Sequence, residues 1–381
     1  MLPALILSAA PTAPAPTDAV PRFFAHLEKL AADGLHSAAQ VYVSRAGSTV
    51  ADFGVGFAQP GIPLTPDSLT LWLSSGKPLT AVALAQVWDD GALDLDDPVA
   101  RHIPGFERAG KESVTLRHLL THTAGLRHVK IDIVAMSWDE IIERVAASPL
   151  EPGWVPGRKA GYHIGCTWFA LAEVVRRITG LPYGPHLQAS LFAPLGMSDC
   201  WMGMPEDAFA RVKDRLVLMY DTSAKGQGAP HPWAEYARVS RCAPSGNAWG
   251  PVRALGFFYE MLLGRGERGG ARVLSAQAVE ALTAPHRVGL FDETFRHGMD
   301  WGLGFIVNSL SRDRETQPYG FGAHASRRVF GHGGYQSSLA FADPEHGLAV
   351  AFVTNGTPGE GRHGKRCREL VTLLYEDLGL S

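Results

Sequence analysis

Segments typical of β-strands lie near both ends of this chain, whereas its long middle has a helical pattern. The expected strands span residues 40–44, 49–56, 302–307, 339–342 and 348–354. Between about residues 80 and 241, apolar residues recur at helical spacing and are interrupted by loops rich in Pro and Gly. Strands from the two chain ends could bury their apolar faces in one hydrophobic core by joining a single sheet. The pattern therefore predicts a discontinuous sheet domain with a helical domain inserted into it.

Helices are also expected near the chain ends, and they complete this division. Residues 19–32, 252–263 and 366–378 have helical spacing of their apolar residues. We assign residues 17–79 and 245–381 to the sheet-containing domain, and residues 80–244 to the inserted helical domain. A functional site is expected in the cleft between the two, because small-molecule sites favour such clefts.

The first 16 residues are apolar and rich in Ala and Pro, and we expect them to form a flexible leader. They resemble a signal peptide poorly, because no Lys or Arg precedes Arg22. The prediction is a cytoplasmic protein, although the short apolar segment leaves secretion open. No stretch of the sequence is long and apolar enough to span a membrane.

The composition excludes several classes of partner. Hydrophobic residues make up 46% of the 381 residues and charged residues 19%, as in a globular protein, and the net charge of −3 provides no basic field for nucleic acid. The four cysteines are far apart, so free buried thiols are expected. His118 and His122 are spaced as in a zinc-binding helix, but Leu119 stands where that motif has Glu. We therefore expect no metal and no cofactor, and structural roles for both histidines.

The segment Ser74-Ser75-Gly76-Lys77 is the strongest chemical signal in the sequence. Three residues are close to one helical turn, so the Ser74 hydroxyl and the Lys77 amine would share a helix face. Pro78 is tolerated only in a first helical turn, which places Ser74 at or just before a helix start. A desolvated, neutral lysine could take the serine proton. The alternative is a helix-capping serine beside a solvated lysine.

Several other segments fit a known family in the same order along the chain. They are residues 73–78, 93–99, 115–126, 330–334 and 341–349, together with Pro156-Gly157 leading to Tyr162. With these motifs the chain resembles the serine β-lactamase-like superfamily, in particular its esterase and transesterase branch near the class C β-lactamases. The resemblance implies a β-lactamase/transpeptidase-like α/β (α+β) fold, with an antiparallel sheet flanked by helices from the two chain ends and an inserted, mainly helical domain.

The resemblance also implies roles for individual residues. Ser74 would be acylated and Lys77 would act as its base, while Tyr162 would carry a proton to the leaving group, its pKa lowered by the nearby ammonium. The segment His332-Gly333-Gly334 takes the place of the family's Lys-Thr-Gly strand and would bind substrate. The backbone N–H groups of Ser74 and Tyr335 would stabilise the oxyanion.

Two departures from the family pattern bear on the substrate. Ile164 stands where β-lactamases and penicillin-binding enzymes have Asn, and His332 stands where a Lys would anchor a carboxylate. Both changes argue against β-lactamase or D-Ala-D-Ala peptidase activity and suit ester substrates. The segment Tyr335-Gln336-Ser337-Ser338 is bulkier and more polar than the small residues common there. Five tryptophans (Trp154, Trp168, Trp233, Trp249 and Trp301) are also expected in or beside the loops around the cleft. Each could stack on a bulky substrate group, and the alternative for each is ordinary packing in the core or at an interface.

The sequence therefore predicts a serine acyl-transfer enzyme that forms an acyl-enzyme on Ser74 from an ester or activated amide. The acyl group would pass either to water, as in a carboxylesterase, or to an alcohol or amine acceptor, as in secondary-metabolite assembly. The alternatives are a β-lactamase or D-Ala-D-Ala peptidase and a non-catalytic penicillin-recognition-like module. The expected partners are small molecules, with no nucleic acid and no membrane.

Overall fold

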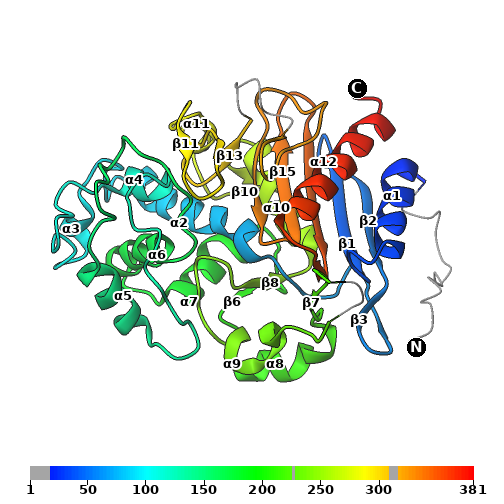
Figure 1. Cartoon of the computed structure of the whole chain (residues 1–381), viewed down its shortest axis with the longest axis horizontal. Helices are drawn as coiled ribbons and strands as arrows, with labels where there is room; N and C mark the ends of the chain where they lie inside the picture. Colours follow the sequence, from blue (N-terminus) through cyan, green and yellow to red (C-terminus); the bar gives the residue numbers. More distant parts are fainter. Residues whose placement is uncertain (1–17, 225–227, 309–315) are drawn as a thin grey trace.

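The central element is a six-stranded antiparallel sheet to which both ends of the chain contribute. The computed structural model describes residues 18–224, 228–308 and 316–381. The strand order is β13-β14-β15-β16-β1-β2. The strands are β1 (Ala39–Arg45), β2 (Ser48–Val55), β13 (Ile306–Val307), β14 (Phe330–Gly334), β15 (Ser338–Asp343) and β16 (Leu348–Thr354). Strands β1 and β16, more than 300 residues apart in the chain, pair so that Val41 lies opposite Phe352. The predicted discontinuous sheet is confirmed (Figure 1).

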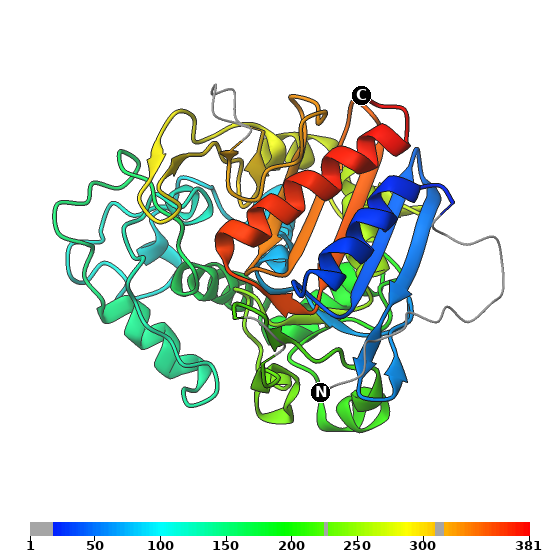
Figure 2. The same cartoon turned by 45° about the vertical axis from the view of Figure 1, so that its right-hand side comes forward.

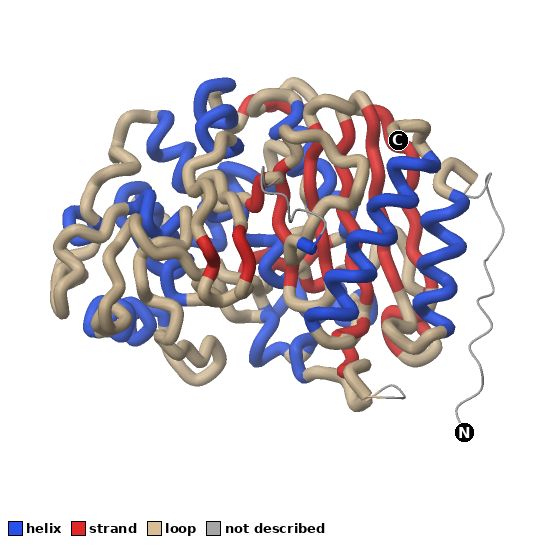
Figure 3. The backbone as a smooth tube through the Cα atoms, turned by 45° about the horizontal axis from the view of Figure 1, so that its top comes forward, coloured by secondary structure: helices blue, strands red, loops and turns tan. Residues whose placement is uncertain are grey.

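Helices cover both faces of this sheet. Helices α1 (Pro21–Ala32) and α12 (Glu360–Asp377) lie side by side on one face (Figures 2 and 3). Helix α10 (Val252–Leu263) packs on the other. Side chains of β16 alternate between the two layers: Val350 and Phe352 pack with the terminal helices, and Ala351 packs with α10.

The remaining elements are further helices, short turns and small sheets. The helices are α2 (Lys77–Asp89), α3 (Val99–His102), α4 (Leu116–Leu120), α5 (Trp138–Ala147), α6 (Cys166–Thr179), α7 (Tyr183–Leu187), α8 (Glu206–Val212), α9 (Tyr236–Val239) and α11 (Ala276–Thr283). Short 3₁₀ or π turns are η1 (Leu73–Gly76), η2 (Gln188–Phe192), η3 (Lys213–Arg215) and η4 (Pro232–Ala234). A three-stranded sheet consists of β5 (Thr70–Leu71), β8 (Ala248–Gly250) and β6 (Trp201–Met202). Two-stranded pairs are β3 (Phe57–Gln59) with β4 (Ile62–Pro63), β7 (Tyr220–Asp221) with β17 (Gly356–Thr357), β9 (Glu267–Arg268) with β10 (Ala271–Arg272), and β11 (Phe291–Asp292) with β12 (His297–Gly298).

One hydrophobic core extends from the helical region to the sheet. It includes Val82 of α2, Leu171 of α6, Leu255 of α10 and Ala340 of β15. Residues 77–85 of α2 are all buried, so this helix has no solvated face at its start. The division into a sheet domain and an inserted domain at residues 79/80 and 244/245 stays a prediction, because this core crosses it.

Two elements differ in length from the sequence prediction. The strand expected over 302–307 is reduced to β13, because Gly304 has a φ of +83° and the Gly302 N–H turns back to the Phe305 carbonyl. Helix α12 begins at Glu360, six residues before the predicted start at Arg366; this first part contains Gly361 and Gly364, which are weak helix formers. Residues 1–16, the predicted leader, lie outside the described residues. Among the helices of the described ranges, none has the length and apolarity needed to cross a membrane.

Candidate active site

Ser74 lies in the 3₁₀ turn η1, immediately before helix α2 begins at Lys77. The preceding residue, Leu73, has a φ of +52°, which is unfavourable for a residue other than Gly. Two glycines make room for this turn. A Cβ at Gly334 would lie 2.6 Å from the Trp72 carbonyl oxygen, and one at Gly246 would lie 3.1 Å from the Leu73 carbonyl carbon. Strand β14 and the 244–247 turn therefore close tightly around the strained residue before Ser74.

The Lys77 amine is buried against Ser74. Its Nζ lies 2.8 Å from Ser74 Oγ and donates to the Ser245 carbonyl oxygen at 2.5 Å. Lys77 is 0% exposed, and burial lowers the pKa of its amine well below 10.5. Ser74 itself is partly exposed and makes no helix-capping hydrogen bond. The alternative of a capping serine beside a solvated lysine is therefore wrong, and the pair places a desolvated amine within hydrogen-bonding distance of the serine hydroxyl.

Tyr162 lies over the same pair. The Lys77 Nζ is 5.3 Å from the centroid of the Tyr162 ring, and the buried Tyr162 hydroxyl completes no hydrogen bond within the described residues. Burial raises the pKa of Tyr162, although a weaker interaction with the Ser74 hydroxyl opposes that rise. The expectation that an ammonium lowers the phenol pKa is wrong for this structure, because Lys77 is itself desolvated and burial disfavours a phenolate.

A buried ion pair holds the backbone of Tyr162. Asp292 Oδ1 accepts from the Tyr162 N–H at 3.1 Å, and Asp292 Oδ2 accepts from Arg287 Nη2 at 2.9 Å. The two charged side chains are 0% and 1% exposed. The Thr294 hydroxyl donates to the Tyr162 carbonyl at 3.0 Å. Sequence reasoning missed these residues, since nothing in the motif around Tyr162 indicates a partner 130 residues away.

The His332-Gly333-Gly334 segment forms most of strand β14 and faces inward. The His332 side chain is 1% exposed, and its Nδ1 lies 2.7 Å from the Gly333 carbonyl, to which it donates. Burial, assisted by Lys77, lowers the pKa of His332 to about 3, so the imidazole is neutral. A Cβ at Gly333 would lie 1.9 Å from Tyr319 Cδ1. The two glycines are thus required by internal packing, whereas substrate binding by His332, Gly333 and Gly334 stays a prediction.

Hydroxyl groups hold β14 and β15 against the turn that carries Ser74. The Ser75 hydroxyl donates to the His332 carbonyl at 3.0 Å and lies 2.9 Å from Ser338 Oγ, which donates to the Trp72 carbonyl at 2.8 Å. Within the described ranges, neither the Ser74 N–H nor the Tyr335 N–H has a hydrogen-bond acceptor of its own. Both are free for the predicted oxyanion role.

His122 is a neighbour of the site that sequence reasoning treated only as structural. It is 0% exposed, has a φ of +58°, and its ring lies 4.7 Å from that of Tyr162 and 4.5 Å from that of Trp301. Its Nδ1 accepts from the His163 N–H at 3.0 Å, so Nε2 carries the proton of the neutral ring. Its position between Thr121 and Thr123, inside a motif shared with the family, was a sequence indication of a place near the site. Only the tertiary structure shows that it contacts Tyr162.

Most of the expected cleft aromatics are buried. Trp168, Trp249 and Trp301 are 0% exposed and Trp154 is 8% exposed, so the expectation that they face a substrate is wrong for these four. Gln336, Ser337 and Ser338 are likewise buried and bonded internally. The exposed side chains near the site are Ile164 at 65% and Tyr335 at 49%, and Trp233 is half-buried.

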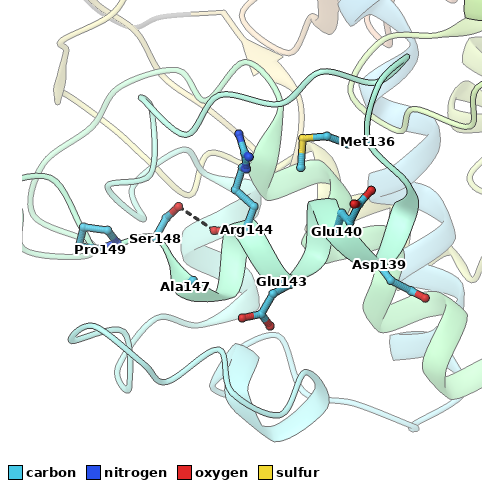
Figure 4. Close-up of a pocket in the computed structure, with 8 residues that line it drawn as sticks. All are labelled: Met136, Asp139, Glu140, Glu143, Arg144, Ala147, Ser148 and Pro149. Carbon is cyan, nitrogen blue, oxygen red and sulfur yellow. Dashed lines mark hydrogen bonds between the residues drawn. The ribbon is translucent and has the colours of Figure 1, made fainter.

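A separate hollow of about 740 Å³ lies along helix α5 (Figure 4). It is lined by Met136, Asp139, Glu140, Glu143, Arg144, Ala147, Ser148 and Pro149, none of which belongs to the candidate site. Within the described part of the chain, no three His, Cys, Asp or Glu side chains are grouped as metal ligands.

Comparison with known proteins finds that the chain is similar to esterases and other proteins of the beta-lactamase family. The family model for Beta-lactamase matches residues 23–372. Esterase EstB of Burkholderia gladioli is 28% identical over 361 residues, covering 84% of this chain and 86% of EstB. The esterase/beta-lactamase LipL of Mycobacterium tuberculosis is 27% identical over 339 residues, covering 81% of this chain and 75% of LipL. The solved structure of a family VIII carboxylesterase matches with a TM-score of 0.80 at 26% identity, covering 97% of this chain and 99% of that one.

Proposed function

Because the chain belongs to the beta-lactamase family, we propose that it is a serine carboxylesterase in which Ser74 is acylated by an ester substrate. The observation that carries the proposal is the Lys77 amine, which is fully buried and 2.8 Å from Ser74 Oγ. A serine needs a neighbouring base to become a nucleophile, and a lysine serves as one only when it is neutral. The esterase names of two relatives and of the carboxylesterase structure support the choice of ester substrates.

The chemistry follows from three side chains and two backbone groups. Ser74 Oγ attacks the ester carbonyl carbon while its proton moves to Lys77 Nζ, and the N–H groups of Ser74 and Tyr335 bind the resulting oxyanion. When the intermediate collapses, the carbon–oxygen bond to the leaving alcohol breaks. The Tyr162 hydroxyl gives its proton to the leaving oxygen and regains one from the Lys77 ammonium. A water molecule then attacks the acyl carbon, and the same groups return the proton to Ser74.

A second candidate is transfer of the acyl group to an alcohol or amine. Tyr335 follows Gly334 directly and is 49% exposed. An acceptor with a flat group could stack on this ring beside the acyl-enzyme, and this binding would favour the acceptor over water, which cannot stack. A single-turnover chase of labelled acyl-enzyme distinguishes the two. Rapid release into buffer, with no partition to a panel of alcohols and amines, supports the esterase. A stable acyl-enzyme that discharges only to an acceptor supports the transferase.

β-Lactamase and peptidase activities are less well supported. Ile164 cannot hydrogen-bond a substrate amide, and the neutral, buried His332 cannot anchor a carboxylate as a lysine would. We expect penicillins to be hydrolysed far less efficiently than good ester substrates. Comparable kcat/KM values for a penicillin and for a 4-nitrophenyl ester would contradict this assignment.

Labelling and substitution test the proposal directly. A fluorophosphonate should add mass to the peptide that carries Ser74, and Ser74→Ala should abolish both labelling and turnover. The matched control is Ser75→Ala, which removes the adjacent hydroxyl and should still label. Lys77→Ala should lower the acylation rate by several orders of magnitude, and Tyr162→Phe by about 10²-fold or more. Near wild-type turnover by Ser74→Ala refutes the mechanism, and a non-catalytic binding module then becomes the better description.

A further inference from the structure

We propose that Arg238, Trp233 and Tyr335 form a subsite for a substrate whose aromatic part carries a carboxylate. The proposal rests on the proposed function and deepens it, because it names the class of ester that the Ser74 site would accept. Three observations carry it: the position of this segment beside Ser74, a guanidinium without an acidic partner, and an exposed aromatic surface between the two.

The segment of η4 and α9 is fixed against the turn that borders Ser74. The Asn247 side-chain amide donates to the Arg238 carbonyl at 2.8 Å and to the Arg241 carbonyl at 2.7 Å. Gly246, beside Asn247, would place a Cβ 3.4 Å from the Ser74 backbone nitrogen. Leu73 belongs to one hydrophobic cluster with Val239, the residue after Arg238, and Trp233 packs against this cluster. The backbone of Arg238 is therefore held against the turn that borders Ser74.

Arg238 has no acidic partner. It is half-buried, its Nε is covered without a hydrogen-bond acceptor, and no carboxylate lies within ion-pair distance of it among the described residues. Burial lowers the pKa of Arg238, and the more distant carboxylate of Asp132 partly opposes this shift. Asp132 is too far from the guanidinium to form an ion pair. Arg127, another half-buried arginine, pairs with Glu151 at 2.5 Å. A half-buried guanidinium is costly without a partner, and a planar carboxylate is the group that it binds best.

Aromatic rings connect this cation to the site. The Arg238 guanidinium lies 5.8 Å from the Trp233 ring centroid, and the His231 ring stacks on Trp233 at 4.1 Å. Trp233 meets Tyr335 edge to face at 6.4 Å, and Tyr335 follows Gly334 at the expected oxyanion position. A substrate ring on the exposed Tyr335 would thus lie between Ser74 and Arg238, with its carboxylate on the guanidinium.

Calorimetric titration tests the subsite without requiring turnover. The probes are 3-phenylpropionate and 3-phenylpropionamide, which have the same ring and linker but end in a charged carboxylate and an uncharged amide, respectively. The wild-type chain is expected to bind the acid about 10-fold more tightly than the amide, as for a hydrogen-bonded charge pair. In Arg238→Gln the two affinities should agree within about twofold. Arg238→Lys keeps the charge but loses the planar guanidinium, so its preference for the acid should be smaller than that of the wild type and larger than that of Arg238→Gln.

The control is Arg241→Gln, which removes an exposed charge three residues away and should keep the wild-type preference. Equal affinities of the wild type for acid and amide overturn the proposal, as does an equal loss of preference in Arg238→Gln and Arg241→Gln. If Arg238→Gln does not fold, Arg238→Lys tests the charge pair, and Tyr335→Ala tests the stacking surface by weakening the binding of both probes.

A kinetic arm links binding to the reaction. The measured quantity is the ratio of kcat/KM for 4-carboxyphenyl butyrate to kcat/KM for the neutral methyl ester of the same compound. This ratio should be about 10-fold lower in Arg238→Gln than in the wild type, through a higher KM for the charged substrate. An unchanged ratio overturns the subsite while leaving Ser74 labelling intact. Loss of Ser74 labelling refutes the proposed function instead, so the two failures are distinguishable.

Discussion

Replacing Asp292 by Asn should destabilise the protein strongly and disturb Tyr162. Asp292 Oδ2 accepts from Arg287 Nη2 at 2.9 Å, with both side chains at most 1% exposed. Asn keeps an oxygen for the N–H groups of Tyr162, Thr294 and Phe295, which Asp292 Oδ1 now accepts at 2.9–3.1 Å. Its amide NH₂, however, would point at the guanidinium, so Arg287 would remain buried, charged and unpaired.

The magnitude follows from that stranded charge. Breaking a buried pair by removing one partner costs about 3–5 kcal/mol. The Arg287 contacts with the carbonyls of Thr121 and Met299 remain, because they do not involve Asp292. A loss near the lower end of this range is therefore expected in the free energy of unfolding. Because the new amide NH₂ and the guanidinium are both donors, their repulsion would displace the side chain whose oxygen holds the Tyr162 N–H. The resulting shift of the Tyr162 backbone should lower kcat by about 10²-fold, as for a misplaced catalytic group.

Urea denaturation and ester hydrolysis measure the two effects. The matched control is Glu293→Gln, the neighbouring carboxylate, which pairs with Arg296 at 3.0 Å with side-chain exposures of 42% and 71%. Such a surface pair contributes about 0–1 kcal/mol, so this variant should match the wild type in stability and rate. If Asp292→Asn also loses less than about 1 kcal/mol, the ion pair does not stabilise the Tyr162 segment and the reasoning is refuted.

Three further outcomes are expected. Lys77→Met should gain stability relative to the wild type as pH falls from 10 to 7. Burial holds the folded pKa of Lys77 well below 10.5, so the unfolded wild type binds one more proton than the folded form in this range and wild-type stability falls with pH. A pH-independent difference between the two proteins in urea denaturation contradicts this expectation. Burial lowers the pKa of His163 to about 3, so the stability that its neutral ring contributes is complete above pH 6.5 and is lost as pH falls towards 3. In His163→Gln the free energy of unfolding should therefore fall less steeply between pH 6 and pH 4 than in the wild type. An equal fall in both proteins would rule out this contribution. Ser75→Ala should lower the unfolding free energy by about 1–3 kcal/mol through its lost hydrogen bonds to His332 and Ser338, whereas a wild-type denaturation midpoint would show that these bonds contribute nothing.

Local patterns predicted the framework of this protein. The apolar run of β16, which is buried along its whole length, and the helical spacing of apolar residues in 252–263 are both set by neighbouring residues alone. The relation of Ser74 to Lys77 is equally local, since three residues span about one helical turn. The order of the family motifs along the chain then predicted how these elements combine, and the predicted antiparallel sheet is confirmed.

The environment of the site was decided only by the tertiary structure. Whether Tyr162 has a raised or lowered pKa depends on how deeply the fold buries it, and sequence reasoning chose the wrong direction. Arg287, Asp292 and His122 approach Tyr162 from segments far away in the chain, and the burial of four of the five tryptophans follows from packing between elements. Periodicity along a chain shows which residues face inward, but desolvation and charge pairing depend on distances between segments that only the folded chain brings together.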